Sequence, residues 1–338
     1  MPVLTEAVKY ADGWVFSDSK QLIHLRIDDS KGPSIKRLEL PSEFQDDQIL
    51  AVACTSDGRW MATCHSSKKV ILFMIKGLKL EHVVESCTVR RASALLFVGD
   101  RLLIVADRFG TVYTVDFPGL LTVREKSKTF TFPSPVLGRC TTITSLSCSP
   151  SGSLLGLGDR DGLVVIADTF CPERIRTILA SHKQYITRVF CLSDEHVVTA
   201  GDSGLLLHYI LEQGRTRFLL APSVCGSIVS FSHSPAPDTS SSLGVLYVLC
   251  SREMNVFLYK VDLDNSESTV ELLIVHSRSP TDTDNYFAIP LTPGYFLDSE
   301  GSLLAPTKVW PGACPLWSGT DPTAFYPAPP AMAREVKV

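Results

Sequence analysis

The chain has 338 residues, of which 45% are hydrophobic and 20% are charged, and its formal net charge is −4 at pH 7. That apolar fraction is enough for a packed core. No run approaches the roughly 18 apolar residues that a membrane-spanning helix needs, which argues against a membrane protein. The acidic balance argues against a domain that binds nucleic acid on its own, since such domains are usually basic. No apolar segment follows a basic stretch near Met1, so we expect no secretory signal.

The first structural unit that we expect covers residues 3–40. Its predicted strands are residues 3–10, 14–16, 22–27 and 35–40, and a turn at Asp18 joins the middle two. The second unit extends from residue 49 to about 85 with the corresponding turn at His65, and the third has its turn at Asp107. Short apolar runs bounded by polar turn residues are typical of strands.

The fourth unit shows the pattern most clearly. Three apolar strands, Ile143–Ser147, Ser153–Leu157 and Leu163–Ile166, are separated by the turns Ser149–Gly152 and Asp159–Gly162. Proline fixes φ and glycine supplies a positive φ, so both turns have a physical cause. Strands and turns in this order make up most of one blade of a WD-type propeller.

The second turn of this unit recurs along the chain. With this turn included, seven such turns begin at Asp18, His65, Asp107, Asp159, Asp202, Ser251 and Asp298, with spacings of 42 to 52 residues. About 40–45 residues are expected per blade, so the repeat predicts an all-β, seven-bladed WD-repeat β-propeller over residues 1–305. The seventh unit lacks an obvious fourth strand. Seven prolines between Pro306 and Pro330 predict an irregular or disordered tail over residues 306–338.

No motif in the sequence indicates catalysis. A G-x-S-x-G elbow, a phosphate-binding G-x-x-x-x-G-K-[ST] loop and an H-E-x-x-H zinc pair are all absent, and the ten cysteines form no C-x-x-C pair. The segment Gly156–Gly158 precedes a turn and an apolar strand, so we interpret its glycines as points of close strand approach. We therefore expect a non-enzymatic protein without a cofactor or a metal ion, whose thiols are reduced.

Two polar residues of the fifth unit are expected to have a structural role. In WD-type blades a histidine before the innermost strand can hydrogen-bond the aspartate of the same blade's second turn. His182 and Asp202 occupy these places in the sequence. We predict that they hydrogen-bond each other and are not a catalytic dyad.

Charged turn residues of the third and fourth units form the candidate partner interface. Equivalent turns of adjacent blades emerge on one rim of a propeller, so Arg108 should lie beside Asp159, Arg160 and Asp161. Propellers bind mainly through such rims, and most bind other proteins. We refer to these four residues as the blade three–four rim. We also expect the Asp159 carboxylate to accept a hydrogen bond within its own turn.

Several segments of the chain resemble one family of WD-repeat proteins, the non-catalytic subunits of tRNA (guanine-N7)-methyltransferase. The similar segments are Ser66–Phe73, Val89–Leu95, Val105–Tyr113, Ser149–Pro150, Asp159–Asp161 and Thr199–Asp202 after His182, all within residues 49–220. The resemblance implies a seven-bladed propeller that holds a small Rossmann-type, S-adenosylmethionine-dependent methyltransferase in its active form on tRNA. It also implies a heterodimer, tRNA contact mainly through the complex, and a location in the nucleus, with the cytoplasm as a second compartment.

The chain departs from the family at two places. Where the family usually carries a basic strand residue that pairs with an acid of the catalytic subunit, this chain has Leu163–Val165. Where the family usually ends in a basic tail, this chain has a proline-rich stretch followed by Ala333–Val338. The first departure implies that Arg108 carries more of the pairing here.

Two alternatives remain open at this point. A generic WD-repeat scaffold of another complex would share the fold and the rim but have a different partner. An enzyme built on a propeller would need a catalytic constellation, and the sequence shows none. Co-purification of a methyltransferase, co-purification of a different partner, and turnover by the isolated chain distinguish the three hypotheses.

Overall fold

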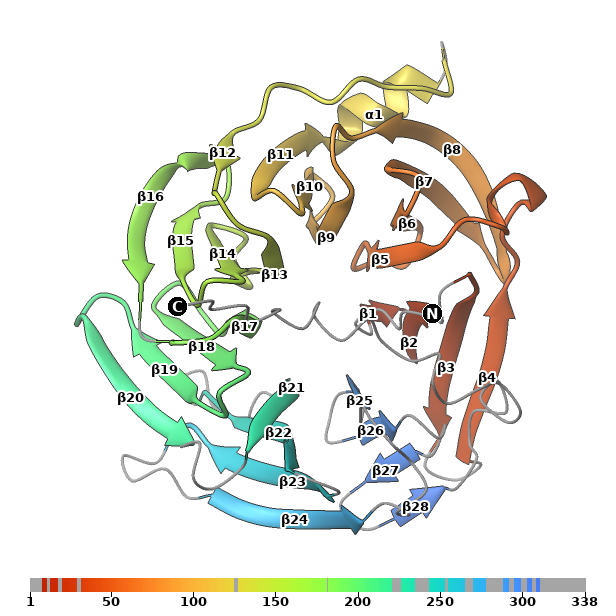
Figure 1. The fold of residues 1–338 in the computed structure, drawn as a ribbon. Coiled ribbons are helices and arrows are strands. Elements are labelled where there is room, and N and C mark those ends of the chain that lie inside the picture. Colours follow the sequence, from red (N-terminus) through yellow and green to blue (C-terminus); the bar gives the residue numbers. More distant parts are fainter. Residues whose placement is uncertain are drawn as a thin grey trace, which may run out of the picture.

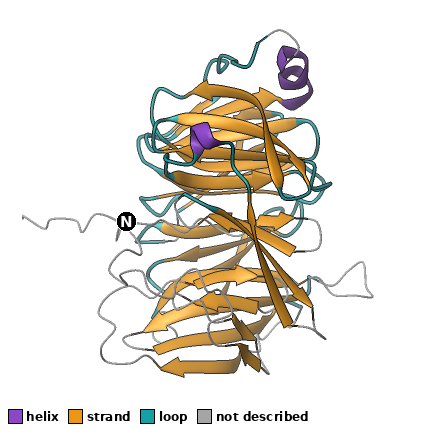
Figure 2. Ribbon diagram, turned by 90° about the vertical axis from the view of Figure 1, so that its right-hand side faces the viewer, coloured by secondary structure: helices purple, strands orange, loops and turns teal. Residues whose placement is uncertain are grey.

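The computed structural model describes most of the chain. The described residues are 8–10, 13–17, 20–28, 32–124, 127–180, 182–220, 226–234, 243–252, 255–264, 270–277, 288–291, 295–298, 303–305 and 308–310. They form an all-β propeller, in which four-stranded antiparallel sheets are arranged around a central axis (Figure 1). Figure 2 shows the ring from its side, with strands throughout its depth and helix at its edge.

Seven four-stranded sheets are present among the described residues. Sheet one contains β1 (Val8–Tyr10), β2 (Gly13–Ser17), β3 (Leu22–Asp28) and β4 (Gly32–Leu38). Sheet two contains β5 (Ile49–Cys54), β6 (Trp60–His65), β7 (Lys69–Lys76) and β8 (Lys79–Cys87). Sheet three contains β9 (Ala92–Val98), β10 (Leu102–Asp107), β11 (Thr111–Asp116) and β12 (Leu137–Gly138). Sheet four contains β13 (Ile143–Cys148), β14 (Leu154–Asp159), β15 (Val164–Asp168) and β16 (Cys171–Leu179).

The remaining sheets follow in the same order. Sheet five contains β17 (Ile186–Cys191), β18 (His196–Gly201), β19 (Leu206–Ile210) and β20 (Arg215–Leu220). Sheet six contains β21 (Ser227–Ser234), β22 (Val245–Arg252), β23 (Asn255–Asp262) and β24 (Val270–Ser277). Sheet seven contains the short strands β25 (Ala288–Leu291), β26 (Tyr295–Asp298), β27 (Leu303–Ala305) and β28 (Lys308–Trp310).

Each sheet is built from consecutive strands, with the first strand innermost (Figure 1). The sequence left open how the ring closes, because propellers often combine N-terminal and C-terminal strands in one blade. In the part of the chain that the structure describes, β1 pairs with β2 and β25 pairs with β26, so no blade mixes the two ends. The missing fourth strand of sheet seven is β28, which lies beyond the expected boundary at residue 305. Residues 311–338 of the predicted tail lie outside the described residues.

Close contact between adjacent blades explains the two glycines of β14. A Cβ atom at Gly156 would lie 2.9 Å from Val189 Cγ1, and one at Gly158 would lie 2.5 Å from Ile186 Cγ2, both on the innermost strand of blade five. Only glycine permits this approach without a shift of the neighbouring blade. The interpretation of these glycines as points of close strand approach is confirmed.

The core lies between the blades. Ala106 and Val112 of blade three form one buried cluster with Leu155, Leu157 and Val165 of blade four. Burial of each leucine contributes about 1.5–3 kcal/mol to folding. Each blade therefore depends on its neighbours, and the turns at the ends of these strands are held in fixed relative positions.

Two short helices lie outside this pattern. The 3₁₀ helix η1 (Ser42–Phe44) precedes β5, and the α-helix α1 (Phe117–Arg124) follows β11 at the outer edge of the ring (Figures 1 and 2). After α1 the chain runs along blade two, where Glu85 N donates to Lys128 O (2.8 Å) and Phe130 N donates to Glu85 O (3.0 Å). This parallel contact covers part of the outer edge of β8. None of the described helices is long and apolar enough to cross a membrane.

Candidate functional site

The turn between β10 and β11 is built around the buried carboxylate of Asp107. Its Oδ1 accepts hydrogen bonds from Phe109 N (2.8 Å) and Thr111 N (2.9 Å). Gly110 has a φ of +81°, a left-handed conformation that glycine adopts without steric cost. The carboxylate and the glycine together fix the turn and leave Arg108 exposed at its tip.

The turn between β14 and β15 repeats this construction with one addition. Asp159 Oδ1 accepts from Asp161 N (3.0 Å) and Leu163 N (2.9 Å), and Gly162 has a φ of +86°. Asp159 Oδ2 also pairs with Arg139 Nη2 at 3.0 Å. Asp159 is 1% exposed, so its carboxylate is used inside the turn. Within the proposed interface this residue can only hold the turn in shape.

Thr142 joins the two turns. Its Oγ1 donates to Arg108 O (2.8 Å), and its backbone carbonyl accepts from Arg160 N (3.0 Å). Arg108 and Asp161 are exposed and Arg160 is half-buried. The turns of blades three and four are therefore neighbours, as expected from the sequence.

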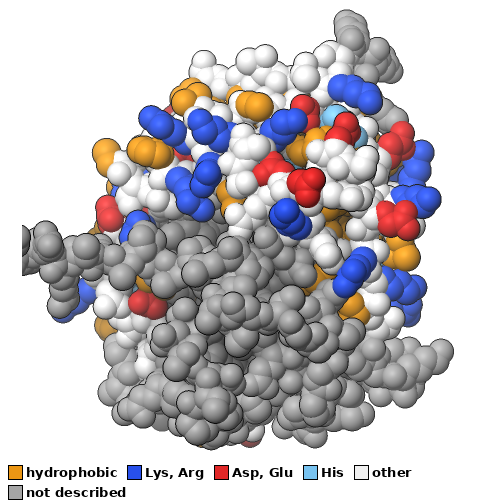
Figure 3. Space-filling view, turned by 45° about the vertical axis from the view of Figure 1, so that its right-hand side comes forward, with side chains coloured by type: hydrophobic (Ala, Val, Ile, Leu, Met, Phe, Trp, Pro, Cys, Tyr) orange, Lys and Arg blue, Asp and Glu red, His pale blue; other side chains and the backbone are white. Residues whose placement is uncertain are grey.

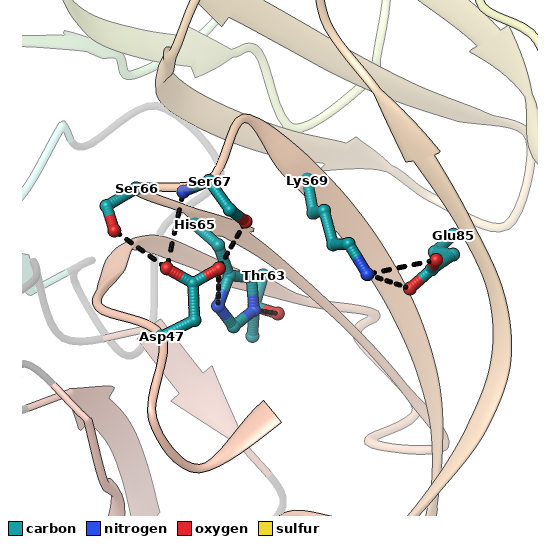
Figure 4. A network of polar contacts seen from close by, with 7 residues as sticks. All are labelled: Asp47, Thr63, His65, Ser66, Ser67, Lys69 and Glu85. Atoms are coloured by element: carbon teal, nitrogen blue, oxygen red, sulfur yellow. Dashed lines mark hydrogen bonds and ion pairs between the residues drawn. The ribbon is translucent and has the colours of Figure 1, made fainter. Parts of the chain in front are cut away.

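Blade two has the same turn with different residues. His65 stands where blades three and four have aspartate, and Lys68 has a φ of +70°, the one positive value at a non-glycine residue in the described part of the chain. Asp47 supplies the missing carboxylate from the preceding loop (Figure 4). Its Oδ1 accepts from Ser66 Oγ (2.7 Å) and Ser67 N (3.2 Å), and its Oδ2 accepts from Ser67 Oγ. A carboxylate 18 residues away in the sequence thus takes the place of the one within the turn.

Blade five shows that the expected alignment is shifted by one residue. Gly201 N donates to Leu205 O at 3.0 Å, just as Asp159 N donates to Leu163 O at 3.0 Å. Gly201 therefore occupies the position of the buried aspartate, and Asp202 occupies the next one along the turn.

The predicted hydrogen bond between His182 and Asp202 is not formed because of this shift. The Asp202 carboxylate accepts from Ser227 Oγ (2.6 Å), and His182 Nε2 lies 2.7 Å from Thr199 Oγ1. His182 Nδ1 faces Gly201, where a Cβ atom would lie only 2.5 Å away. His182 is buried, and burial lowers its pKa to about 4. Its position is within the blade, away from solvent.

Arg139 and His182 are equivalent residues in adjacent blades. Each lies four residues before the first residue of an innermost strand, β13 or β17. Arg139 meets the carboxylate of Asp159, whereas His182 meets Gly201. Sequence reasoning missed Arg139, because no motif links a residue in a long connection to a turn 20 positions later.

Exposed apolar residues beside Arg108 were also missed. Val89, in the loop before β9, is 73% exposed, and Phe109 is 60% exposed. The Arg90 guanidinium lies 4.6 Å from the centre of the Phe109 ring, within the range of a cation–π contact. A phenylalanine inside a tight polar turn was the signal in the sequence that could have revealed this surface.

A second pair of titratable side chains, His196 and His208, lies inside blade five. No group of three or more His, Cys, Asp or Glu side chains among them could hold a metal ion. His196 Nδ1 lies 2.8 Å from His208 Nε2 between β18 and β19, and burial lowers the pKa of both, that of His208 to about 4. The contact joins two strands of one sheet.

Comparison with known proteins confirms the family resemblance. The chain is 27% identical over 166 residues to the tRNA (guanine-N(7)-)-methyltransferase non-catalytic subunit WDR4 of Mus musculus, covering 48% of this chain and 37% of the relative. It is 25% identical over 243 residues to the subunit TRM82 of Meyerozyma guilliermondii, covering 63% and 56%. The Xenopus laevis subunit wdr4 is 23% identical over 261 residues, covering 70% and 60%. The matches thus span between 37% and 60% of the length of these relatives.

Two further comparisons bear on the fold. No protein-family model matches the chain. A chain in the crystal structure of a mitotic checkpoint complex superimposes with a TM-score of 0.63 at 13% sequence identity, covering 92% of this chain and 86% of that chain. At this identity the likeness supports the propeller fold alone.

Proposed function

We propose that this chain is a non-catalytic propeller subunit required for forming N7-methylguanosine in tRNA. In this proposal it docks a Rossmann-type, S-adenosylmethionine-dependent methyltransferase and stabilises it on tRNA. The observation that carries the proposal is that its matched relatives are all named as non-catalytic subunits of tRNA (guanine-N(7)-)-methyltransferase. The propeller itself would supply binding surface and no chemistry.

The blade three–four rim is the proposed docking surface. The Thr142 contacts hold the Arg108 and Arg160 backbones in fixed relative positions, so these side chains are presented on a rigid support. Arg108 and Asp161 carry opposite charges at exposed tips of adjacent turns. Such charges mainly set the orientation and rate of encounter, while a pair that becomes desolvated can cost about 2–5 kcal/mol when one side is removed.

Arg108 has the principal pairing role in this proposal. Val165 is almost completely buried in the cluster between blades three and four, so β15 offers the partner no charge at this position. Arg108 is exposed and has five donors in a planar fork that suits a carboxylate. An acidic side chain on the catalytic subunit is the expected counterpart.

Two charge reversals test this docking surface. Arg108→Glu and Asp161→Lys, made separately, should each weaken co-purification of the catalytic subunit and lower guanine-N7 methylation, with thermal melting unchanged. Arg101→Glu is the matched control, because Arg101 is also exposed but lies in the turn between β9 and β10, at the opposite rim. Full binding and full methylation by both rim variants would place the interface elsewhere.

A generic scaffold in another complex is the second candidate. The structural likeness to a chain of a mitotic checkpoint complex shows that this fold occurs in other assemblies. Purification of the tagged chain separates the candidates: a methyltransferase supports the first, and a different stable partner supports the second. We also propose that the complex acts in the nucleus, with the cytoplasm as a second compartment, which imaging of the tagged chain would test.

A further inference from the structure

Phe109 stands out among the equivalent turns of blades two to five, because it places an apolar side chain at an exposed position. The third residue of the equivalent turns is Ser67, Asp161 or Ser203, all of them polar. The Phe109 backbone N–H already closes the turn by donating to Asp107 Oδ1, and any residue type could supply that group. A phenylalanine that is 60% exposed at such a place indicates a binding surface.

The surroundings of Phe109 are basic. Arg90, Arg91 and Arg108 are all exposed, and none forms an ion pair with the residues that the structure describes. The nearby carboxylate of Asp107 is 1% exposed and is engaged by the turn. Arg90 stacks on Phe109, and Arg91 O accepts from Arg108 N (3.0 Å), so three arginines without an ion pair among the described residues gather at this turn. Val89, the residue before Arg90, adds a second exposed apolar side chain.

Elsewhere on the ring, exposed cations are often paired. Arg59 pairs with Asp57, Lys76 Nζ lies 2.7 Å from Glu81 Oε2, and Arg176 Nε lies 2.5 Å from Asp168 Oδ1. On the right of Figure 3, lysine and arginine side chains lie among aspartate and glutamate. The unpaired arginines around Phe109 thus leave a local positive charge on a chain whose net charge is −4.

From these observations we infer that Phe109 and Val89 are the apolar anchor of the blade three–four rim. The occupant is a segment of the catalytic subunit that places an apolar side chain against Phe109 and carboxylates against Arg90, Arg91 and Arg108. This inference rests on the proposed function and adds the chemistry of the partner's segment. Arg90 already covers part of the ring, so the partner contacts the remaining surface.

A buried apolar centre with charged surroundings is the usual arrangement of binding hot spots. RNA is the less favoured occupant, because Asp161 lies beside the arginines. A protein segment can place a basic side chain opposite this carboxylate, whereas a phosphate backbone offers no such group. Only three exposed arginines gather there, which limits the electrostatic attraction of a nucleic acid. A protein segment with alternating apolar and acidic side chains meets both features of the surface.

Phe109→Ala tests the inference, with Phe170→Ala as the matched control. Phe170 is 53% exposed, and the Arg101 guanidinium lies 4.9 Å from its ring centre. This pair reproduces the Arg90–Phe109 stack at the opposite rim, in the turn between β15 and β16. With the purified catalytic subunit as the probe, Phe109→Ala should weaken binding by about tenfold or more. Phe170→Ala should stay within about twofold of the unmodified chain, and both variants should melt at its temperature.

The outcomes separate this inference from the proposed function. If Arg108→Glu abolishes binding while Phe109→Ala stays within about twofold, the apolar anchor is wrong and the docking surface stands. If the unmodified chain does not bind the catalytic subunit, the proposed function fails and the inference with it. If Phe109→Ala lowers the tRNA affinity of the isolated chain but leaves binding of the catalytic subunit unchanged, this surface binds RNA and the inference is overturned.

Discussion

Removing the carboxylate of Asp159 should destabilise the ring more than removing the equivalent carboxylate of Asp107. Both side chains accept two backbone hydrogen bonds in their own turns, at 2.8 and 2.9 Å for Asp107 and at 3.0 and 2.9 Å for Asp159. Asp159 alone also pairs with a guanidinium, that of Arg139 at 3.0 Å. The two alanine variants therefore differ by one ion pair.

The structure sets the expected magnitudes. An Asp107→Ala change leaves two part-buried N–H groups without an acceptor, which costs about 1–3 kcal/mol of unfolding free energy. Asp159→Ala causes the same loss and also leaves Arg139 without its partner. In the unmodified chain the side chains of this pair are mostly buried, at 20% exposure for Arg139 and 2% for Asp159. Breaking a buried pair by removing one partner costs about 3–5 kcal/mol. We expect Asp159→Ala to lower the unfolding free energy by about 1–3 kcal/mol more than Asp107→Ala does.

Urea unfolding of the purified chain measures these differences. Asp161→Ala is the control, because Asp161 is exposed and contributes only its backbone N–H to the turn, so it should change stability by less than about 0.5 kcal/mol. The double variant of Asp159 and Arg139 completes a cycle. Residues in one ion pair should show a coupling energy of about 0.5–3 kcal/mol.

Two results would refute this reasoning. Equal losses for Asp159→Ala and Asp107→Ala, with no coupling between Asp159 and Arg139, would show that the ion pair adds nothing to stability. An Asp161→Ala variant as unstable as Asp159→Ala would mean that the turn is not held by its buried carboxylate.

Four further predictions concern pH, backbone conformation at two positions, and RNA. Burial lowers the pKa of His65, His182 and His208 from an ordinary 6.5 to about 4. Between pH 6.5 and pH 4 the unfolded chain therefore binds more protons than the folded chain, so the folded state loses stability as the pH is lowered. The urea concentration at the unfolding midpoint should decrease over this range, and a constant midpoint would contradict the prediction. Lys68→Gly should raise the unfolding free energy by about 0.5–1 kcal/mol, because the left-handed φ of +70° costs lysine more than the added chain entropy costs glycine. Gly110→Ala should lower the unfolding free energy by about 2 kcal/mol or more, since the added Cβ would lie 2.5 Å from two backbone oxygens. A lower melting temperature for Lys68→Gly, or an unchanged or higher one for Gly110→Ala, would contradict these two predictions. The isolated chain should bind tRNA weakly and with a shallow salt slope, because few basic contacts release few counterions, and filter binding that is tight and steeply salt-dependent would disagree.

The repeat and its turns could be predicted from the sequence because turn chemistry is local. The aspartate accepts from the backbone N–H groups two and four residues after it, and the glycine with positive φ lies three residues after it. That pattern identified the turns of Asp107 and Asp159 and, from the blade order, the proximity of Arg108 to Arg160. The same locality explains the one-residue error at Gly201 and Asp202. Both residues suit a turn, and only the strand register distinguishes their positions.

Tertiary structure decided the features that depend on residues far apart in the sequence. Asp47 replaces a turn carboxylate in blade two, Arg139 neutralises Asp159, and Thr142 ties the turns of blades three and four together. Exposure is likewise a property of the assembled ring. An apolar side chain in a sequence predicts burial on average. The polar turn around Phe109 was a sign of exposure in the sequence, and the neighbouring loop and blade decided that the side chain is 60% exposed. The sequence alone determined where the chain turns, because a turn is closed by its own few atoms. The ring determined which side chains remain free to bind, because that depends on what every neighbouring blade already covers.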